Sequence, residues 1–316
     1  MTDDQATRPL RPATGVHRWR GRALVVVSAA TALLIAGHQL LPDVAGVGTL
    51  LDSAAPWLGL AVPPLLIVAL RRRTRSALAA LVPLVVWCVV FGPALLPQGG
   101  GTGGDLRVVG QNLWAGNTDP DLTASDLAAT GADVVGVQEL TGRGRRAVER
   151  ALGDELPYHA GVGTVGIWSR YPIGIVERVD LGLGWARALR AAVDTPHGPV
   201  VVYVAHLPSL RQGTVDSRDR ALTELAARLR ADDATRGIVL ADLNTGADDR
   251  AMRLLPTTVR PVLLDAGSGF GFTWPAVFPV VRLDHVLQWG LRPADSSTVH
   301  TRGTDHRAVQ ADLAFG

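Results

Sequence analysis

Three apolar stretches in the first 96 residues restrict how this chain can fold. They cover residues 23–41, 54–70 and 78–96, and each is 17 to 19 residues long. A helix needs about 20 apolar residues to cross the hydrocarbon core of a bilayer. These stretches also lack the polar face that a helix on a soluble domain carries. A cleaved signal peptide would explain the first stretch only, so the sequence predicts three transmembrane helices.

The chain divides into four predicted parts around these stretches. They are an Arg-rich tail (1–22), a three-helix membrane anchor (23–96), a Gly-rich linker (97–104) and a soluble domain (105–316). Eight flexible linker residues span about 15 Å on average, which would hold the domain close to the membrane. Cys88 is the only cysteine, so an intrachain disulfide is excluded and the domain must depend on a hydrophobic core.

The positions of the arginines predict the orientation in the membrane. The tail carries five arginines and the loop at Arg71–Arg75 carries four, whereas residues 42–53 and the stretch from 97 to 106 carry none. Cytoplasmic loops are enriched in Lys and Arg. We therefore expect a multi-pass protein of the cell membrane, with a cytoplasmic N-terminus and, after three crossings, an extracytoplasmic soluble domain.

The charge of the two halves bears on the partners of the protein. Residues 1–104 carry nine arginines and four aspartates, a net charge of +5, whereas residues 105–316 carry 22 arginines and 25 acidic residues, a net charge of −3. The chain has no lysine. Nucleic-acid binding draws much of its affinity from basic side chains, so the soluble domain is not expected to bind nucleic acid. The sequence predicts the bilayer as a partner and indicates no protein partner.

One apolar run ends in residues suited to phosphate chemistry. Gly237–Ala241 is rich in β-branched residues and predicts a buried strand, which ends at Asp242 and Asn244. Strand alternation puts these two side chains on one face, with Leu243 in the core. A carboxylate binds a metal ion or accepts a proton, and an amide donates to an anionic oxygen. The alternative is an Asx turn that closes the strand.

Six other polar residues follow or end apolar stretches of the soluble domain. They are Asn112, Glu139, His206, Asp284, Asp305 and His306. Each has a structural alternative, such as an ion pair of Asp284 with Arg282 or a buried core position for His206. Strands dominate this domain, with helices predicted at residues 123–130, 141–152 and 217–231, the first capped by Thr123 or Ser125. This order predicts an α+β fold of two packed sheets with outer helices.

The polar residues stand in motifs that resemble the endonuclease/exonuclease/phosphatase superfamily, which includes pancreatic-type deoxyribonucleases and sphingomyelinases. The motifs, in family order, are Gln111–Trp114, Val137–Leu140, Ile167–Pro172, Ala205–Leu207, Ala241–Asn244, Arg282–Asp284 and Thr304–His306. The chain has Ala205 where the family has Thr and Ala241 where it has Gly. The resemblance covers residues 106–314 and implies a DNase I-like α/β sandwich.

The resemblance also implies a role for each polar residue. Glu139, with Asn112 and Asp305, is expected to bind Mg²⁺, with Mn²⁺ as the alternative. The catalytic residues are expected to be His206, Asp242, Asn244, Asp284 and His306. In this set Asp242 orients or deprotonates the attacking water, and His306, held by Asp284, stabilises the charge on phosphorus. Phosphate contacts are expected from Asn112, Asn244, His206 and Arg187, although a structural ion pair is the alternative for Arg187.

Further segments are similar to membrane-anchored phosphatases of the vancomycin/teicoplanin resistance protein J type. They are Pro56–Pro63, Val165–Pro172, Tyr203–Pro208 and Phe272–Pro279. This resemblance implies a metal-dependent phosphohydrolase acting on lipid phosphates or pyrophosphates of the outer leaflet, in the cell-wall lipid carrier cycle and in glycopeptide resistance. The alternatives are a membrane-tethered exported nuclease or phosphodiesterase and a non-catalytic scaffold on the same fold.

Overall fold

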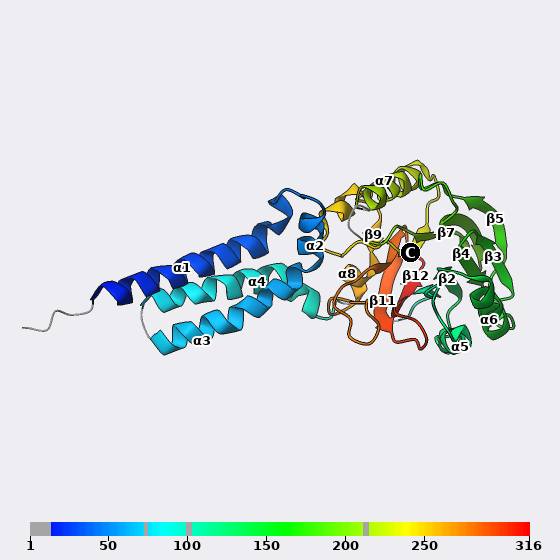
Figure 1. The fold of residues 1–316 in the computed structure, drawn as a ribbon. Coiled ribbons are helices and arrows are strands. Elements are labelled where there is room, and N and C mark those ends of the chain that lie inside the picture. Colours follow the sequence, from blue (N-terminus) through cyan, green and yellow to red (C-terminus); the bar gives the residue numbers. More distant parts are fainter. Residues whose placement is uncertain (1–13, 73–74, 99–102, 211–214) are drawn as a thin grey trace, which may run out of the picture. The chain divides into compact units, whose positions relative to one another are not determined.

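The computed structural model describes residues 14–72, 75–98, 103–210 and 215–316. The predictions for tail residues 1–13, for Arg73 and for linker residues 99–102 lie outside the described residues. The remaining chain forms two units (Figure 1). The first contains the described residues up to His38 together with Ala55–Gly92, and the second contains Gln39–Ala54 together with Pro93–Gly316.

The first unit is helical. Its segments are α1 (Thr14–Gly37), η2 (Ala55–Ala61), α3 (Val62–Arg72), η3 (Arg75–Ala80) and α4 (Leu81–Leu95). Three helical stretches are long and apolar enough to cross a membrane, Gly21–Leu40, Ala55–Arg72 and Ser76–Leu95. Only 17 to 28% of each stretch is buried, so most of the apolar side chains face outward, as in helices solvated by lipid. The three predicted apolar helices are confirmed, and their orientation stays a prediction.

The second unit contains two six-stranded sheets. The first sheet has the order β11 (Arg292–Val299), β12 (Ala308–Ala314), β1 (Leu106–Asn112), β2 (Val134–Gln138), β4 (Val165–Ser169) and β3 (Tyr158–Val162). The second has the order β5 (Ile173–Arg178), β6 (Ala188–Thr195), β7 (Gly198–His206), β8 (Gly237–Asp242), β10 (Asp284–Trp289) and β9 (Arg260–Pro261). Each sheet has one parallel pair, β1–β2 and β7–β8, while its other pairs are antiparallel.

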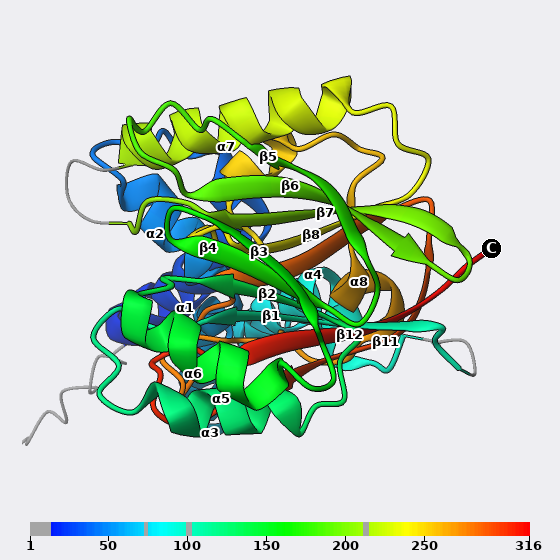
Figure 2. The ribbon, with the colours of Figure 1, turned by 90° about the vertical axis from the view of Figure 1, so that its right-hand side faces the viewer.

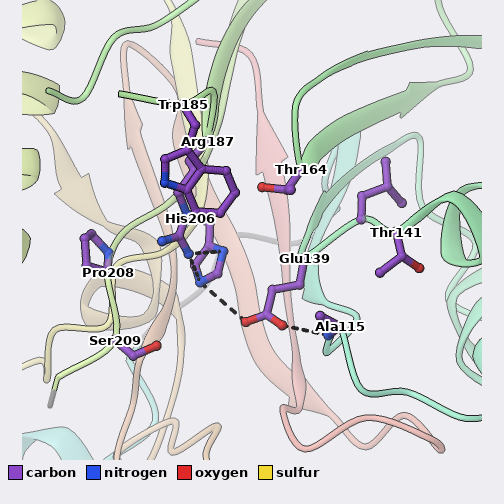
Figure 3. A pocket seen from close by; sticks show the side chains of 10 residues that line it. Ala115, Glu139, Thr141, Thr164, Trp185, Arg187, His206, Pro208 and Ser209 are labelled. Carbon is purple, nitrogen blue, oxygen red and sulfur yellow. Dashed lines mark hydrogen bonds and ion pairs between the residues drawn. The ribbon is translucent and has the colours of Figure 1, made fainter. Parts of the chain in front are cut away.

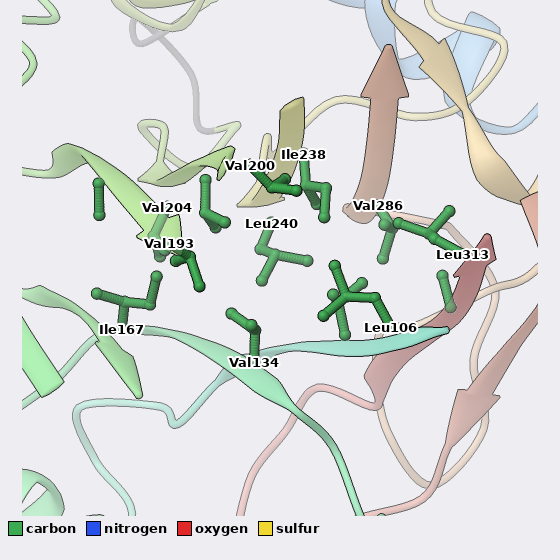
Figure 4. Close-up of a cluster of buried hydrophobic side chains, with 14 of the residues drawn as sticks. Leu106, Val134, Ile167, Val193, Val200, Val204, Ile238, Leu240, Val286 and Leu313 are labelled. Carbon is green, nitrogen blue, oxygen red and sulfur yellow. The ribbon is translucent and has the colours of Figure 1, made fainter. Parts of the chain in front are cut away.

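The main hydrophobic core lies between the two sheets (Figure 4). Val134 and Ile167 come from the first sheet, Val204 and Ile238 from the second, and all four are fully buried. Burying one such side chain contributes about 1.5–3 kcal/mol. Because strands alternate their side chains, the same strands bury their other faces under outer helices.

The two sheets approach each other closely at Gly136 of β2 and Leu240 of β8. A Cβ atom on Gly136 would lie 2.9 Å from the Cβ of Leu240, so only glycine fits there. Two residues further along β2, the Gln138 amide donates to the carbonyl of the same Leu240 across the core (3.0 Å). A buried amide that finds a partner in the opposite sheet fixes how the two sheets align. This alignment brings the ends of β2 and β8 together.

Helices cover both outer faces of the sandwich (Figure 2). The first sheet carries α5 (Pro120–Ala128) and α6 (Gly142–Leu152), and the second carries α7 (Val215–Ala231). The predicted apolar stripe of α7, Leu222, Leu225 and Leu229, is buried against the second sheet. The short segments α2 (Val47–Ser53), η1 (His38–Leu40), η4 (Arg250–Leu254) and α8 (Val262–Ala266) complete the described helices.

The predicted fold class is confirmed, with differences in detail. The first helix of the domain begins at Pro120 and not at Thr123 or Ser125, because proline suits the first turn of a helix, with Asp119 before it. Strands β3, β5 and β11 were not predicted from the sequence. Two of them, β3 and β5, are largely exposed edge strands and therefore lack a clear apolar alternation. Residues 39–54 were expected within the anchor region, but their contacts group them with the sandwich.

A buried polar cluster ties β6, β7 and the end of α7 together. Arg190 donates to both carboxylate oxygens of Asp232 (2.7 and 3.0 Å), and the hydroxyl of buried Tyr203 donates to the same carboxylate. Burial opposes the charge on Asp232, but these hydrogen bonds lower its pKa to about 2. Hydrogen bonds to a charged group are among the stronger ones in proteins.

We predict that Asp232→Asn lowers the free energy of unfolding by about 1–3 kcal/mol at pH 7. Since the folded state lowers the pKa of Asp232 from 3.8 to about 2, its contribution is complete above pH 4 and disappears as the pH falls through 2. Thermal unfolding of the detergent-solubilised protein between pH 7 and pH 2 measures this. Asp121→Asn, in the exposed ion pair with Arg150, is the control and should cost less than about 1 kcal/mol. Equal destabilisation by both changes would contradict the prediction.

Candidate active site

Strand register assembles the predicted site residues at one edge of the sandwich. Asn112 ends β1 opposite Gln138, and Glu139 follows β2 directly. His206 ends β7 opposite Asp242, which ends β8. Parallel strands end at the same edge of a sheet, so each parallel pair delivers two polar residues there. The antiparallel strand β10 begins opposite Asp242 with Asp284, which adds a third carboxylate.

The Asn112 amide connects the two sheets at this edge. Its Nδ2 donates to Glu139 Oε1 (3.3 Å) and to Asp242 Oδ2 (2.8 Å), while its Oδ1 accepts from the backbone of Trp114 (2.8 Å). The backbone N–H of Ala115 donates to Glu139 Oε2 (2.7 Å). Both amide protons of Asn112 therefore hold carboxylates in place, which makes it a positioning residue for Glu139 and Asp242.

Three residues of the site adopt the left-handed backbone conformation that side chains disfavour. Trp114, Glu139 and Asn244 have φ angles of 61°, 52° and 47°. Such conformations cost of order 1–3 kcal/mol each and concentrate at functional sites. The turn at Asn244 is the Asx turn that was the structural alternative, since its N–H donates to Asp242 Oδ1 (3.0 Å). The turn also buries the side chains of Asp242 and Asn244 at the site. The Asx turn and the predicted site are therefore compatible interpretations of these two residues.

Asp284 and His306 form a buried pair. His306 Nδ1 lies 2.8 Å from Asp284 Oδ2, and the backbone of Asp284 donates to Thr273 Oγ1 (3.3 Å). Burial opposes the charge on His306, but Asp284, Asp242 and Asp305 raise its pKa to about 10. His306 is therefore an imidazolium at neutral pH, as expected for a group that stabilises negative charge on a phosphoryl oxygen. The alternative pairing of Asp284 with Arg282 is not observed among the described residues.

Asp242 lies at the centre of the site and is 1% exposed. Burial raises its pKa to about 7, helped by the negative charge of Asp284 and opposed by His306 and by hydrogen bonds from Asn112 and Asn244. A carboxylate with a pKa near neutrality both exists in its basic form and binds a proton readily. Asp242 is thus suited to accept a proton from water.

His206 and Arg187 belong to the second sheet and its edge, and the His206 ring points toward the Glu139 carboxylate (Figure 3). His206 Nε2 lies 3.6 Å from Glu139 Oε1 and 3.7 Å from Asp242 Oδ2. Burial, together with Arg187 and His306, lowers the pKa of His206 well below its usual range, so these contacts involve a neutral imidazole. Nη2 of Arg187 lies 2.5 and 2.6 Å from the two ring nitrogens of His206, and its guanidinium stacks on Trp185 at 4.7 Å. No described carboxylate forms an ion pair with Arg187, so its cation faces the cavity.

Two recesses open beside these groups and share Ala115, Glu139 and Ser209 in their walls. One has a volume of about 450 Å³ and is lined by Arg187 and His206 among others. The other has a volume of about 560 Å³, and its polar lining residues include Glu139, Asp242, Asn244, Asp305 and His306. These volumes are typical of small-molecule sites. Seven of the nine predicted site residues line these two recesses, and the other two, Asn112 and Asp284, are hydrogen-bonded to residues that do.

The donor set fits a hard divalent cation. Oδ1 of Asp284 and Oδ1 of Asp305 are buried and accept no hydrogen bond from any described residue. Two arrangements are available, the predicted set around Glu139 and a cluster of Asp242, Asp284 and His306 whose ligand atoms lie within 4.8 Å of one another. In that cluster His306 Nδ1 already pairs with Asp284 Oδ2 (2.8 Å), and this carboxylate raises the pKa of His306, which opposes metal binding by its imidazole. This favours Glu139 and Asp305 as the carboxylates that would hold the cation.

The chain belongs to the Endonuclease/Exonuclease/phosphatase family, whose model matches residues 110–306. Family enzymes are phosphoesterases and generally depend on a divalent metal. No curated protein sequence matches the chain significantly.

Solved structures share the fold of the sandwich at low sequence identity. A mannosyl-6-phosphatase of Bacteroides thetaiotaomicron is 14% identical, with a TM-score of 0.59 over 67% of this chain and 100% of that one. Sphingomyelinase C from Streptomyces griseocarneus is 19% identical, with a TM-score of 0.54 over 66% of this chain and 99% of that one. A humanised D. rerio TDP2 is also 19% identical, with a TM-score of 0.58 over 66% and 98%. These values establish the DNase I-like fold.

Several residues of the site were not predicted from the sequence. Trp185 and the α2 residues Leu50 and Ser53 line its recesses, and Thr273 anchors the backbone of Asp284. Trp185 stands only two positions before Arg187, so its contact with the guanidinium was a local signal in the sequence. The α2 residues carried no such signal, since they lie about 190 positions from Asp242.

We predict that Asp284→Asn lowers kcat by about 10²–10³-fold while KM changes little. The amide keeps the size of the side chain but removes the negative charge that holds His306 as an imidazolium, and this loss is felt mainly in the transition state. Steady-state hydrolysis of a chromogenic phosphate ester measures the effect. Asp295→Asn, at an exposed position of β11, is the control and should behave as wild type. An unchanged kcat in Asp284→Asn would contradict the role of the pair.

Proposed function

We propose that the protein is a membrane-anchored, divalent-metal-dependent phosphohydrolase that acts on lipid phosphates or pyrophosphates of the outer leaflet. The observation that carries the proposal is the buried cluster in which Asn112 joins Glu139 and Asp242 beside the Asp284–His306 pair. Family membership supports phosphoester hydrolysis, and the three apolar helices support a membrane location.

Each side chain has a distinct task in the proposed mechanism. Asp242 accepts the proton of the attacking water, and its pKa of about 7 suits this task at neutral pH. Neutral His206 donates a hydrogen bond to a phosphoryl oxygen, while imidazolium His306 stabilises the charge that develops there. Asn244 uses one amide proton on the carbonyl of Leu207 (2.9 Å), which leaves the other for phosphate.

A divalent cation held by Glu139 and Asp305 would supply Lewis-acid stabilisation of phosphoryl oxygens. Mg²⁺ is the expected ion, since it prefers carboxylate oxygens, and Mn²⁺ is the alternative. Arg187 faces the neighbouring recess and supplies a fixed positive charge for a phosphate contact. The Arg187 position suits a second phosphate group, which supports the inclusion of pyrophosphates in the proposed substrate class.

The lipid part of the proposal comes from charge and connectivity. The soluble domain has a net charge of −3 and no lysine, which is unfavourable for a nuclease. The distribution of arginines supports an extracytoplasmic site, and the segments shared with the glycopeptide-resistance type support the cell-wall carrier lipid as substrate. The tethered nuclease remains the second enzyme candidate, and the non-catalytic scaffold remains the candidate of another class.

The proposal is tested with detergent-solubilised protein and Mg²⁺. We predict phosphate release from undecaprenyl pyrophosphate or phosphatidate at a kcat/KM at least about tenfold above that for a water-soluble phosphomonoester, with no nicking of plasmid DNA. EDTA and Glu139→Gln should each abolish the release, because the cation and its carboxylate are both required.

Other outcomes separate the alternatives. Salt-sensitive cleavage of plasmid DNA without phosphate release would favour the nuclease. Failure to hydrolyse any substrate, together with a Glu139→Gln strain that keeps the wild-type cellular phenotype, would favour the scaffold. Either result would overturn the proposed lipid phosphohydrolase.

A further inference from the structure

The segment between the first two apolar helices, Gln39–Ala54, packs on the catalytic sandwich. Its strongest contact is made by the fully buried carboxylate of Asp52, which accepts two hydrogen bonds from the Arg250 guanidinium (2.6 and 3.1 Å) and one from the Arg250 backbone (3.1 Å). A buried, two-pronged pair of this kind has a defined geometry. It fixes α2 against η4 across 198 positions of sequence.

A second set of contacts joins this segment to the loop that carries Asn244. Fully buried Arg218 donates to Asp249 Oδ2 (2.8 Å), to Thr245 Oγ1 (2.9 Å) and, at 3.5 Å, to Thr49 of α2. A Cβ atom on Gly246 would lie 2.7 Å from the hydroxyl oxygen of Ser53. The inter-helix segment and the catalytic loop are therefore in direct contact.

Leu50 and Ser53 line the same recess as Asp242, Asn244, Asp305 and His306. The apolar part of this lining includes Leu50, Trp114, Trp274, Val281 and Leu283. Leu50 is 61% exposed, so most of its surface is available for contact. The recess thus has apolar side chains next to charged ones. A phosphate that carries an apolar chain requires this arrangement.

We propose that α2 is a fixed wall of the active site and that Leu50 is a specificity-determining residue, which contacts the apolar chain of a phosphorylated amphiphile. This inference rests on the proposed phosphohydrolase function. The segment continues directly into the candidate spans Gly21–Leu40 and Ala55–Arg72. Because the wall is covalently joined to apolar helices at both ends, only an amphiphile at the membrane surface matches both its chemistry and its connections.

Leu50→Asn tests the inference in the full chain. Two matched pairs of phosphomonoesters serve as substrates, phosphatidate with glycerol 3-phosphate and undecaprenyl phosphate with isopentenyl phosphate. Each pair shares its reacting group and differs in apolar length. We expect the ratio of kcat/KM, long-chain over short-chain, to fall by about tenfold, the size expected for the loss of one apolar contact.

Two further variants make the result specific. Val47→Asn is the matched control, because Val47 lies on the same helix, is 65% exposed and does not line the recess. It should keep the wild-type ratio, and Leu50→Met, which restores an apolar side chain of similar size, should keep most of it. An unchanged ratio in Leu50→Asn, or an equal fall in Val47→Asn, would overturn the inference and leave the phosphohydrolase intact. A wild-type protein that hydrolyses neither these four esters nor undecaprenyl pyrophosphate would contradict the proposed function, and the inference with it.

Discussion

The Asn112 amide is the contact on which the site depends. It ends a central strand of one sheet and donates to a carboxylate of each sheet, Glu139 and Asp242. Its position follows from strand register, since the two parallel pairs end at one edge of the sandwich. A one-residue slip in β1 would turn Asn112 into the opposite face and separate the two carboxylates. The core between the sheets, and the close approach of Gly136 to Leu240, prevent such a slip.

This edge concentrates more negative than positive charge. Four carboxylates, those of Glu139, Asp242, Asp284 and Asp305, face the two cations Arg187 and His306. The pKa of Asp242 near 7 and that of His306 near 10 are two responses to this imbalance, since each binds a proton more tightly. Binding of a divalent cation would be a third way to balance this charge, because the cation would neutralise the negative charge that remains on the carboxylates. The proposed chemistry of this site therefore depends on uncompensated charge in a buried position.

The sequence predicted the sandwich and the polar residues at strand ends, because strand periodicity and family motifs are local signals. It did not predict which residues meet, and the contact of Arg187 with His206 and the hydrogen bonds of Asn112 to both sheets became visible only with the strand register. The packing of α2 on the sandwich could not have been predicted. Asp52 and Arg250 are 198 positions apart, and the sequence around each is compatible with an exposed charged side chain. Pro120 was a local signal for the start of α5. Thr123 and Ser125 are also residue types that cap helices, and they led to a predicted start that was too late.

Location of the bound cation tests the central claim most directly. Anomalous diffraction from crystals of the full chain soaked in Mn²⁺ would show where the ion binds. The account predicts a peak in direct contact with the Glu139 carboxylate, in the recess shared with Asp305, and its loss in Glu139→Gln. A peak confined to the cluster of Asp242, Asp284 and His306, or no peak in either recess, would contradict it.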